Sequence, residues 1–142
     1  MSIFTGPGSE KLRELTCTLA GGCSSDTPPV DPEKLPGLLA AVPFWKLRED
    51  GMALTRSFTA KNFMAAIAFF NKVAEVAEAE GHHPDLKLHN YRDVEITVCT
   101  HAAGALTYPD FVLASKLDAL DVDYSPKWLQ QYRERAASRT GQ

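Results

Sequence analysis

Segments of alternating apolar and polar residues come in two closely spaced pairs, and this spacing constrains the fold more than any other feature. The first pair lies in residues 44–58, on either side of the turn Glu49-Asp50-Gly51. The second lies in residues 86–98, with its turn at 90–93. In the first pair, Trp45 and Leu47 alternate with polar neighbours, and Met52, Leu54, Arg56 and Phe58 resume a period of two after the turn. The strands of the second pair are indicated by Leu86 and Leu88 and by Val94, Ile96 and Val98. A helical crossover does not fit within such short connections, so the strands are predicted to pair as antiparallel hairpins.

One long amphipathic helix is predicted between the two hairpins. Apolar residues recur there at helical spacing, at Phe63, Ile67, Phe70, Ala74 and Ala77. We expect Thr59 to cap the start of this helix and Gly81 to end it after Glu80, because glycine readily adopts the left-handed conformation that closes a helix.

Three further helices are expected. Asp31-Pro32 is typical of a helix start, and Pro36 predicts that this helix is short. The sequence 107–110 reads as a capping box, followed by Leu113, Leu117 and Leu120 on one face. A last helix is predicted to begin at Ser125-Pro126 and to fray after Arg135. The fold class is therefore α+β, with a four-stranded antiparallel sheet covered by helices on one face.

The chain is long enough for one domain with a substantial core, because it has 142 residues. Residues 1–30 are predicted to form a partly irregular N-terminal arm, since Gly, Ser, Thr, Cys and Pro dominate much of this stretch. Residues 31–123 hold the predicted domain, and residues 124–142 form a C-terminal helical tail.

Composition argues against several classes of partner. The formal net charge is -3 and the basic residues are scattered, so direct nucleic-acid binding is not expected. No apolar run approaches the roughly 20 residues of a membrane span, and the first residues lack the apolar block of a signal peptide. The three cysteines, Cys17, Cys23 and Cys99, show no C-x-x-C spacing. A reducing compartment is expected, either the cytoplasm or, if a transit segment has been removed, an organelle.

All four histidines lie between residues 82 and 101, which makes this segment the candidate site. His82 and His83 follow the predicted helix end, and His101 follows the last predicted strand. Glu78 precedes His82 by one helical turn and is expected either to orient its ring or to hold a polar ligand. His89 is expected on the solvated face of its strand and is left out of the site. Histidines bracketed by carboxylates are typical of proton-transfer sites.

The residues alone leave three interpretations open: a buried structural cluster, a metal site, and an acid/base site. Zinc accepts imidazole ligands, but an adjacent pair cannot easily turn both rings toward one ion, and the usual i, i+2 or i, i+4 spacings are absent. Asp110 also has two interpretations, because an acidic residue at this position can serve either the helix N-terminus or the site.

The spacing of these residues resembles the signature of a known family. The pattern begins at Glu78, and His82-His83-Pro84 follows after three residues. Tyr91 comes after six more residues, His101 after a further nine, and Asp110 after a further eight. This pattern is similar to that of the pterin-4a-carbinolamine dehydratases. The segments 44–47, 54–58, 80–86, 100–107 and 110–114 also resemble segments of that family, and the likeness runs from about Asp31 to Leu120. The run Glu80-Gly81-His82-His83-Pro84 is closer to plant and bacterial members.

The resemblance implies an αββαββα fold, assembled as a homodimer or homotetramer, that binds a small-molecule pterin. It implies dehydration of a 4a-hydroxytetrahydropterin to the quinonoid dihydropterin without a metal or a cofactor. His82 and His101 would exchange protons with the substrate, and His83 would hold it. The other residues that the resemblance places at the substrate are Glu78, Pro84, Thr100, Ala102, Ala103, Trp45 and Asp110. Trp45 has a second interpretation, in which it only closes the core.

The resemblance also implies an alternative role in protein binding. Some family members act as dimerisation cofactors of a homeodomain transcription factor, and relatives that lack the histidines act as assembly chaperones of a photosynthetic carboxylase. Such a role predicts an exposed apolar helix face for a protein partner. Gly81 and Tyr108-Pro109 stand where animal members often carry charges, which puts the choice of pterin in question more than the chemistry.

Overall fold

The computed structural model describes residues 4–17, 22 and 24–140. In chain order, its elements are α1 (Ser9–Glu14), α2 (Leu35–Ala41), β1 (Lys46–Leu47), β2 (Leu54–Thr59), α3 (Phe63–Glu80), β3 (Asp85–His89), β4 (Asp93–Val98), the 3-10 turn η1 (His101–Ala103), α4 (Tyr108–Asp118) and α5 (Pro126–Thr140). The predicted α+β class is confirmed.

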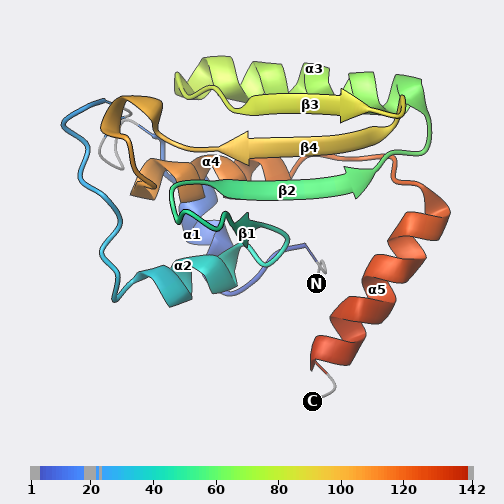
Figure 1. Ribbon diagram of the computed structural model, residues 1–142, viewed down its shortest axis with the longest axis horizontal. Helices are drawn as coiled ribbons and strands as arrows, with labels where there is room; N and C mark the ends of the chain where they lie inside the picture. Colours follow the sequence, from blue (N-terminus) through green and yellow to red (C-terminus); the bar gives the residue numbers. More distant parts are fainter. Residues whose placement is uncertain (1–3, 18–21, 23, 141–142) are drawn as a thin grey trace.

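The four strands form one antiparallel sheet in the order β1-β2-β4-β3 (Figure 1). Both predicted hairpins are present, because β1 pairs with β2 and β3 pairs with β4. The central pairing joins the two hairpins, with Leu54 opposite Val98 and Thr59 opposite Asp93. The two hairpins therefore meet through their longer strands, and the ends of β3 and β4 that carry the candidate site lie at the same end of the sheet.

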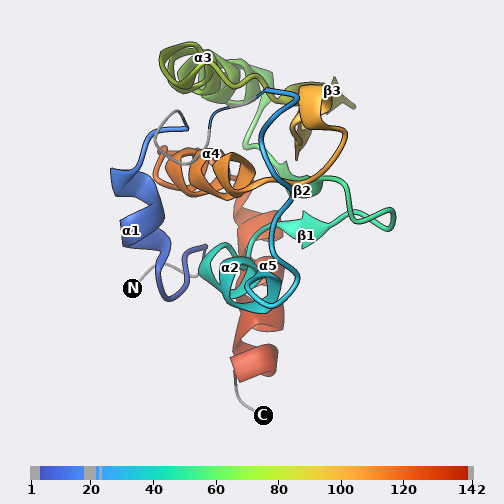
Figure 2. The ribbon, with the colours of Figure 1, turned by 90° about the vertical axis from the view of Figure 1, so that its left-hand side faces the viewer.

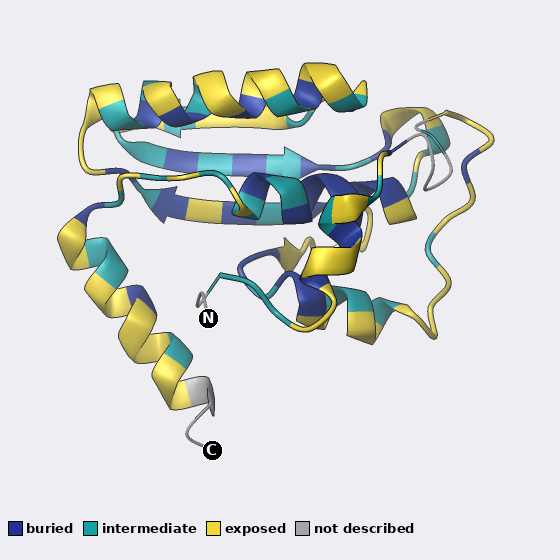
Figure 3. Cartoon of the chain, turned by 180° about the vertical axis from the view of Figure 1, so that it is seen from behind, coloured by how far each residue is buried: buried dark blue, intermediate teal, exposed yellow. Residues whose placement is uncertain are grey.

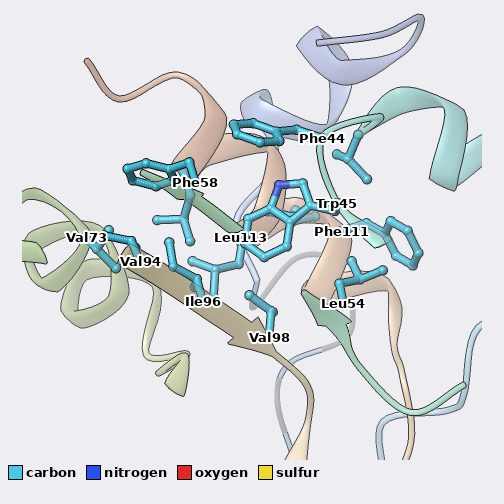
Figure 4. Close-up of a cluster of buried hydrophobic side chains, with 14 of the residues drawn as sticks. Phe44, Trp45, Leu54, Phe58, Val73, Val94, Ile96, Val98, Phe111 and Leu113 are labelled. Carbon is cyan, nitrogen blue, oxygen red and sulfur yellow. The ribbon is translucent and has the colours of Figure 1, made fainter. Parts of the chain in front are cut away.

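Helices α3 and α4 cover one face of the sheet, and α1 packs on α4 (Figure 2). Strands β2 and β4 alternate between this face and the other, as their period of two requires. Figure 3 shows that α4 is largely buried, whereas α3 is buried along one stripe only. The core between these layers includes Leu54, Phe58, Val94, Ile96, Val98, Phe111 and Leu113 (Figure 4).

Helix ends agree with the sequence at some positions and differ at others. Gly81 ends α3 with a φ of 64°, as predicted. The predicted cap at Thr59 is wrong, because Thr59 is the last residue of β2; the side chain of Asn62 accepts a hydrogen bond from the Ala65 N–H at 2.8 Å instead. The capping box of Thr107 and Asp110 is present at the start of α4.

Two helix bounds also differ from the predictions. Helix α2 begins at Leu35, not at Asp31-Pro32, which places Pro36 in its first turn, where the missing N–H costs no hydrogen bond. Helix α5 continues past Arg135 to Thr140. Trp128 and Tyr132, on the inward side of this helix, pack against Phe44, and this packing supports a longer helix than propensity alone predicts.

The described parts of the N-terminal arm pack against the rest of the molecule. Leu12 and Cys17 are buried, and the ring of Phe4 stacks on Phe44 with 4.5 Å between centroids. Phe4 also contacts Tyr132 of α5, at 5.1 Å. Residues 1–3, 18–21, 23 and 141–142, and with them Cys23, lie outside the described residues. Cys99 is a free thiol. Within the described part of the chain, no helix is both long enough and apolar enough to cross a membrane.

Candidate active site

A buried hydrogen bond joins His82 to Asp110 and forms the centre of the site. His82 follows the left-handed Gly81, which turns the chain away from α3 and brings this histidine toward α4. His82 Nε2 lies 2.6 Å from Asp110 Oδ1, and both side chains are almost completely buried. A carboxylate has acceptor atoms only, so we assign the proton to His82 Nε2. This assignment leaves Nδ1 of a neutral His82 as the nitrogen able to accept a proton.

Two threonines hold the Asp110 carboxylate in place. The Thr107 backbone N–H donates to Asp110 Oδ2 at 2.8 Å, and Thr100 Oγ1 lies 3.1 Å from both carboxylate oxygens. The hydroxyls of Thr100 and Thr107 are 2.6 Å apart. Asp110 therefore accepts hydrogen bonds from the start of α4 and pairs with His82 at the same time. Its helix-capping interpretation is confirmed, and its role in the site stays a prediction.

His83 directly follows His82 in the sequence, but its side chain faces solvent. Its Nε2 is 2.6 Å from Glu78 Oε2, and both side chains are more than half exposed. The expectation that Glu78 orients the ring of His82 is wrong. His82 points inward and pairs with Asp110, and Glu78 pairs with the exposed His83 instead. Glu78 and His83 thus form a polar pair on the surface next to the buried one.

His101 is the third histidine of this region and begins the 3-10 turn η1. Its exposed ring lies 3.8 Å from the carboxylate of Asp85, which is only two residues after His83. Cys99 Sγ is 3.5 Å from His101 Nε2. Burial, together with the charges of Asp110 and Asp85, raises the pKa of the Cys99 thiol, and Arg48 opposes this shift. Cys99 is therefore a neutral neighbour of His101 at physiological pH.

The remaining predicted substrate contacts divide between the site and the core. Pro84 directly follows His83 and is partly buried, whereas Ala102, which is exposed, and Ala103, which is partly buried, follow His101 in the 3-10 turn η1. Trp45 lies in the hydrophobic cluster of Figure 4 and is 4% exposed. Its indole N–H donates to Asp118 Oδ1 at 2.9 Å. The structure therefore realises the core interpretation of Trp45.

A separate groove lies between the sheet and α5. It has a volume of about 700 Å³ and is lined by residues that include Phe44, Ser57, Trp128 and Tyr132. His89 is exposed and lines this groove, apart from the three site histidines. We place the candidate site by its chemistry, because the groove holds none of the buried histidine–carboxylate pairing found at His82. Among the described residues, no group of three or more His, Cys, Asp or Glu side chains is arranged to hold a metal ion.

Sequence reasoning did not include Thr107, Cys99 and Asp85 in the site. Thr107 was recognisable as a helix cap, but a cap residue gives no sign that its hydroxyl also meets Thr100. Cys99 is two residues before His101, a spacing that brings two side chains to the same side of an extended chain. For Asp85 the signal is weaker, because its approach to His101 depends on the register of β3 against β4.

The family model described as Pterin 4 alpha carbinolamine dehydratase matches residues 28–120. A putative pterin-4-alpha-carbinolamine dehydratase of Halorhodospira halophila is 40% identical over 77% of this chain and 96% of its own length. The mitochondrial pterin-4-alpha-carbinolamine dehydratase 2 of Arabidopsis thaliana is 46% identical over 61% of this chain and 47% of its own length.

A solved structure adds the fold to this likeness. The transcriptional coactivator/pterin dehydratase from Brucella melitensis is 30% identical, with a TM-score of 0.60, over 65% of this chain and 97% of its own. The matched segment 28–120 contains every histidine of the site, together with Glu78 and Asp110. The chain belongs to the pterin-4a-carbinolamine dehydratase family.

Proposed function

We propose that this protein dehydrates a 4a-hydroxytetrahydropterin to the quinonoid dihydropterin and water, as part of pterin recycling. The observation that carries the proposal is the buried His82–Asp110 pair at 2.6 Å, with two exposed histidines close to it in the fold. A buried histidine held by a carboxylate is a group whose tautomer is fixed, which suits it to proton transfer.

The reaction needs two proton transfers and no change of oxidation state. The bond between ring carbon 4a and its hydroxyl breaks, and the hydroxyl leaves as water after taking a proton from an acid. A base removes the proton from the neighbouring ring nitrogen N5, whose electron pair forms the new double bond to carbon 4a. Two histidines on opposite sides of the ring meet this requirement, because one can give a proton while the other takes one.

The geometry supports a division of roles among the three histidines. His82, whose Nε2–H is held by Asp110, and the exposed His101 are proposed to exchange the two protons. His83 and Glu78, both exposed and hydrogen-bonded to each other, are proposed to bind the polar edge of the pterin. Pro84, Ala102 and Ala103 are proposed to border the ring, and Thr100 to contribute through its contact with Asp110.

A stopped-flow assay of dehydration, with chemically prepared 4a-hydroxytetrahydropterin, tests the proposal. We expect His82→Ala and His101→Ala each to lower the catalysed rate by roughly 100-fold or more, the usual contribution of a positioned acid or base. His89→Ala is the matched control, since His89 is an exposed histidine of the same sheet that lines the separate groove. Equal rates for wild type, His82→Ala and His101→Ala would rule the enzymatic proposal out.

Protein binding is a second proposed role, and one observation favours it. Phe63 and Met64, at the start of α3, are 49% and 72% exposed, which is unusual for large apolar side chains. The Brucella melitensis relative is named a transcriptional coactivator as well as a pterin dehydratase. This face is proposed to contact a second copy of the chain in a homo-oligomer, or another protein. His101→Ala would leave such a role intact while it lowers the rate of dehydration.

The proposed compartment is the cytoplasm or an organelle. The free thiol of Cys99 suits a reducing environment, and the Arabidopsis thaliana relative is named mitochondrial.

A further inference from the structure

The N-terminal arm reaches the two helix ends that carry the candidate site. The Cys17 backbone N–H donates to Glu80 Oε1 at 2.8 Å, across 63 positions of sequence. Cys17 Sγ lies 3.7 Å from the Pro109 carbonyl oxygen, across 92 positions. Cys17 itself is 1% exposed. A segment outside the family match at 28–120 is therefore packed between the end of α3 and the start of α4.

Glu80 connects three parts of the molecule through one carboxylate. Its Oε1 accepts the Cys17 N–H, and its Oε2 lies 3.3 Å from Lys116 Nζ of α4. The Glu80 side chain is 9% exposed. Burial raises the pKa of this carboxyl, but the hydrogen bond from Cys17 and the charge of Lys116 outweigh burial and lower it overall. Glu80 is therefore a charged, doubly held group inside the junction of α3, α4 and the arm.

This junction spans the same two elements as the His82–Asp110 hydrogen bond. Glu80 is the last residue of α3 and stands two positions before His82, with only Gly81 between them. Pro109 stands directly before Asp110 in the first turn of α4. A displacement of either helix end would therefore change the 2.6 Å distance between His82 Nε2 and Asp110 Oδ1. Hydrogen bonds depend steeply on distance and angle, so small displacements matter.

We infer that Glu80, held by Cys17 and Lys116, is a positioning residue that keeps His82 and Asp110 in hydrogen-bonding geometry. The inference rests on the proposed function for its catalytic consequence, because His82 acts there as a proton-transfer group. It also gives the N-terminal arm a role in the site, although the arm lies outside the segment that matches the family model. Glu80 touches neither the substrate nor the reacting atoms; it acts through the positions of His82 and Asp110.

The direct test measures the His82 proton in the chain of 142 residues, with the N-terminal arm present. In a 15N-labelled sample, the proton between His82 Nε2 and Asp110 should give a low-field signal, which Asp110→Asn assigns by removing it. We expect Glu80→Ala to weaken or shift this signal and to lower kcat by on the order of 10- to 100-fold with little change in KM. Glu80→Gln can still accept the Cys17 N–H and should lie between Glu80→Ala and wild type.

Two further variants complete the experiment. Glu75→Gln is the matched control, because Glu75 is an exposed carboxylate of the same helix, and we expect it to behave as wild type. Lys116→Met removes only the ion pair and decides the question should Glu80→Ala fail to fold. An unchanged His82 signal and an unchanged kcat in the folded variants, with only a lower melting temperature, would overturn the inference. If the wild-type protein showed no dehydration activity, the proposed function would be wrong. The effect of Glu80→Ala on the His82 signal would still show whether Glu80 positions His82.

Discussion

Two aspartates with buried side chains stand at opposite ends of α4 and show how position decides what a carboxylate does. Asp110, in the first turn, receives the Thr107 N–H and the hydrogen bond from His82, and the helix dipole favours its negative charge. Asp118 is the last residue of the helix, where the dipole opposes a negative charge. Its Oδ1 meets Trp45 and Arg56, whereas its Oδ2 is buried with no hydrogen-bond partner among the described residues.

This difference predicts a pH-dependent stability that originates at Asp118. Burial raises its pKa from 3.8 to about 7, although Arg56 and the Trp45 hydrogen bond oppose the shift. Between those values the unfolded chain releases the proton and the folded chain keeps it, so this residue makes the folded state less stable as the pH rises from about 4 to about 7. Above about 7 the effect is constant. Each unit of pKa difference corresponds to about 1.4 kcal/mol.

Urea unfolding at half-unit steps of pH measures this effect in wild type and in Asp118→Asn. Asparagine keeps an oxygen for the Trp45 indole N–H but cannot titrate, so the variant should lack the part of the pH dependence that Asp118 causes. Glu80 contributes in the opposite direction, because its lowered pKa stabilises the fold above its ordinary value of 4.5 and this contribution is lost in acid. The same decline from pH 4 to 7 in both proteins would contradict the assignment to Asp118.

At the scale of elements, the site depends on how one helix ends and another begins. Gly81 adopts a φ of 64°, and its N–H bonds back to Ala77 and Glu78, so the chain leaves α3 abruptly with His82 directed inward. The capping box of Thr107 and Asp110 opens α4 on the other side. A loop in place of either helix end would leave His82 and Asp110 on separate mobile segments. The two caps therefore contribute to function as well as to stability.

Replacement of Gly81 tests this connection between helix end and site. An added Cβ would meet no heavy atom within 4 Å, so the cost of Gly81→Ala comes from the left-handed conformation and should be about 1 kcal/mol of unfolding free energy. Because His82 follows directly, the dehydration rate should fall as well. Gly37→Ala is the control: Gly37 lies within α2 in equally open space, and alanine there should be neutral or stabilising by up to about 1 kcal/mol. Similar losses in both variants would argue against strain at Gly81.

At the scale of the whole molecule, sequence patterns predicted what depends on neighbouring residues and missed what depends on distant ones. The strand alternation, the stop at Gly81 and the capping box of 107–110 are local, and all three are present. Glu78 pairs with His83 because His82 points away from Glu78, toward Asp110. Asp110 lies 28 positions after His82, so no local pattern predicts this pairing. The contact of Cys17 with Glu80 has no local sign at all. The proposed site histidines come from the resemblance, because a family signature records such long-range contacts as a spacing of residues.

The two segments outside the family match meet each other on the surface of the domain. Phe4 of the arm lies between Phe44 and Tyr132, with ring centroids 4.5 and 5.1 Å away, and Trp128 and Tyr124 extend the aromatic cluster. Behind this cluster, the guanidinium of Arg56 lies 4.3 Å from the centroid of Phe44 and is 1% exposed. The arm and α5 therefore cover a buried charge that the domain alone would leave closer to solvent.

This packing predicts that the arm and α5 stabilise each other. In a double-mutant cycle, Phe4→Ala and Tyr132→Ala should show a coupling free energy of about 0.5–1.5 kcal/mol, as expected for aromatic pairs in contact. Chemical denaturation of the four proteins gives this value. Phe4→Ala combined with Leu86→Ala is the control cycle, because Leu86 is partly exposed on strand β3, and there the two effects should add within about 0.5 kcal/mol. Additive effects in both cycles would mean that the arm and α5 pack on the domain independently of each other.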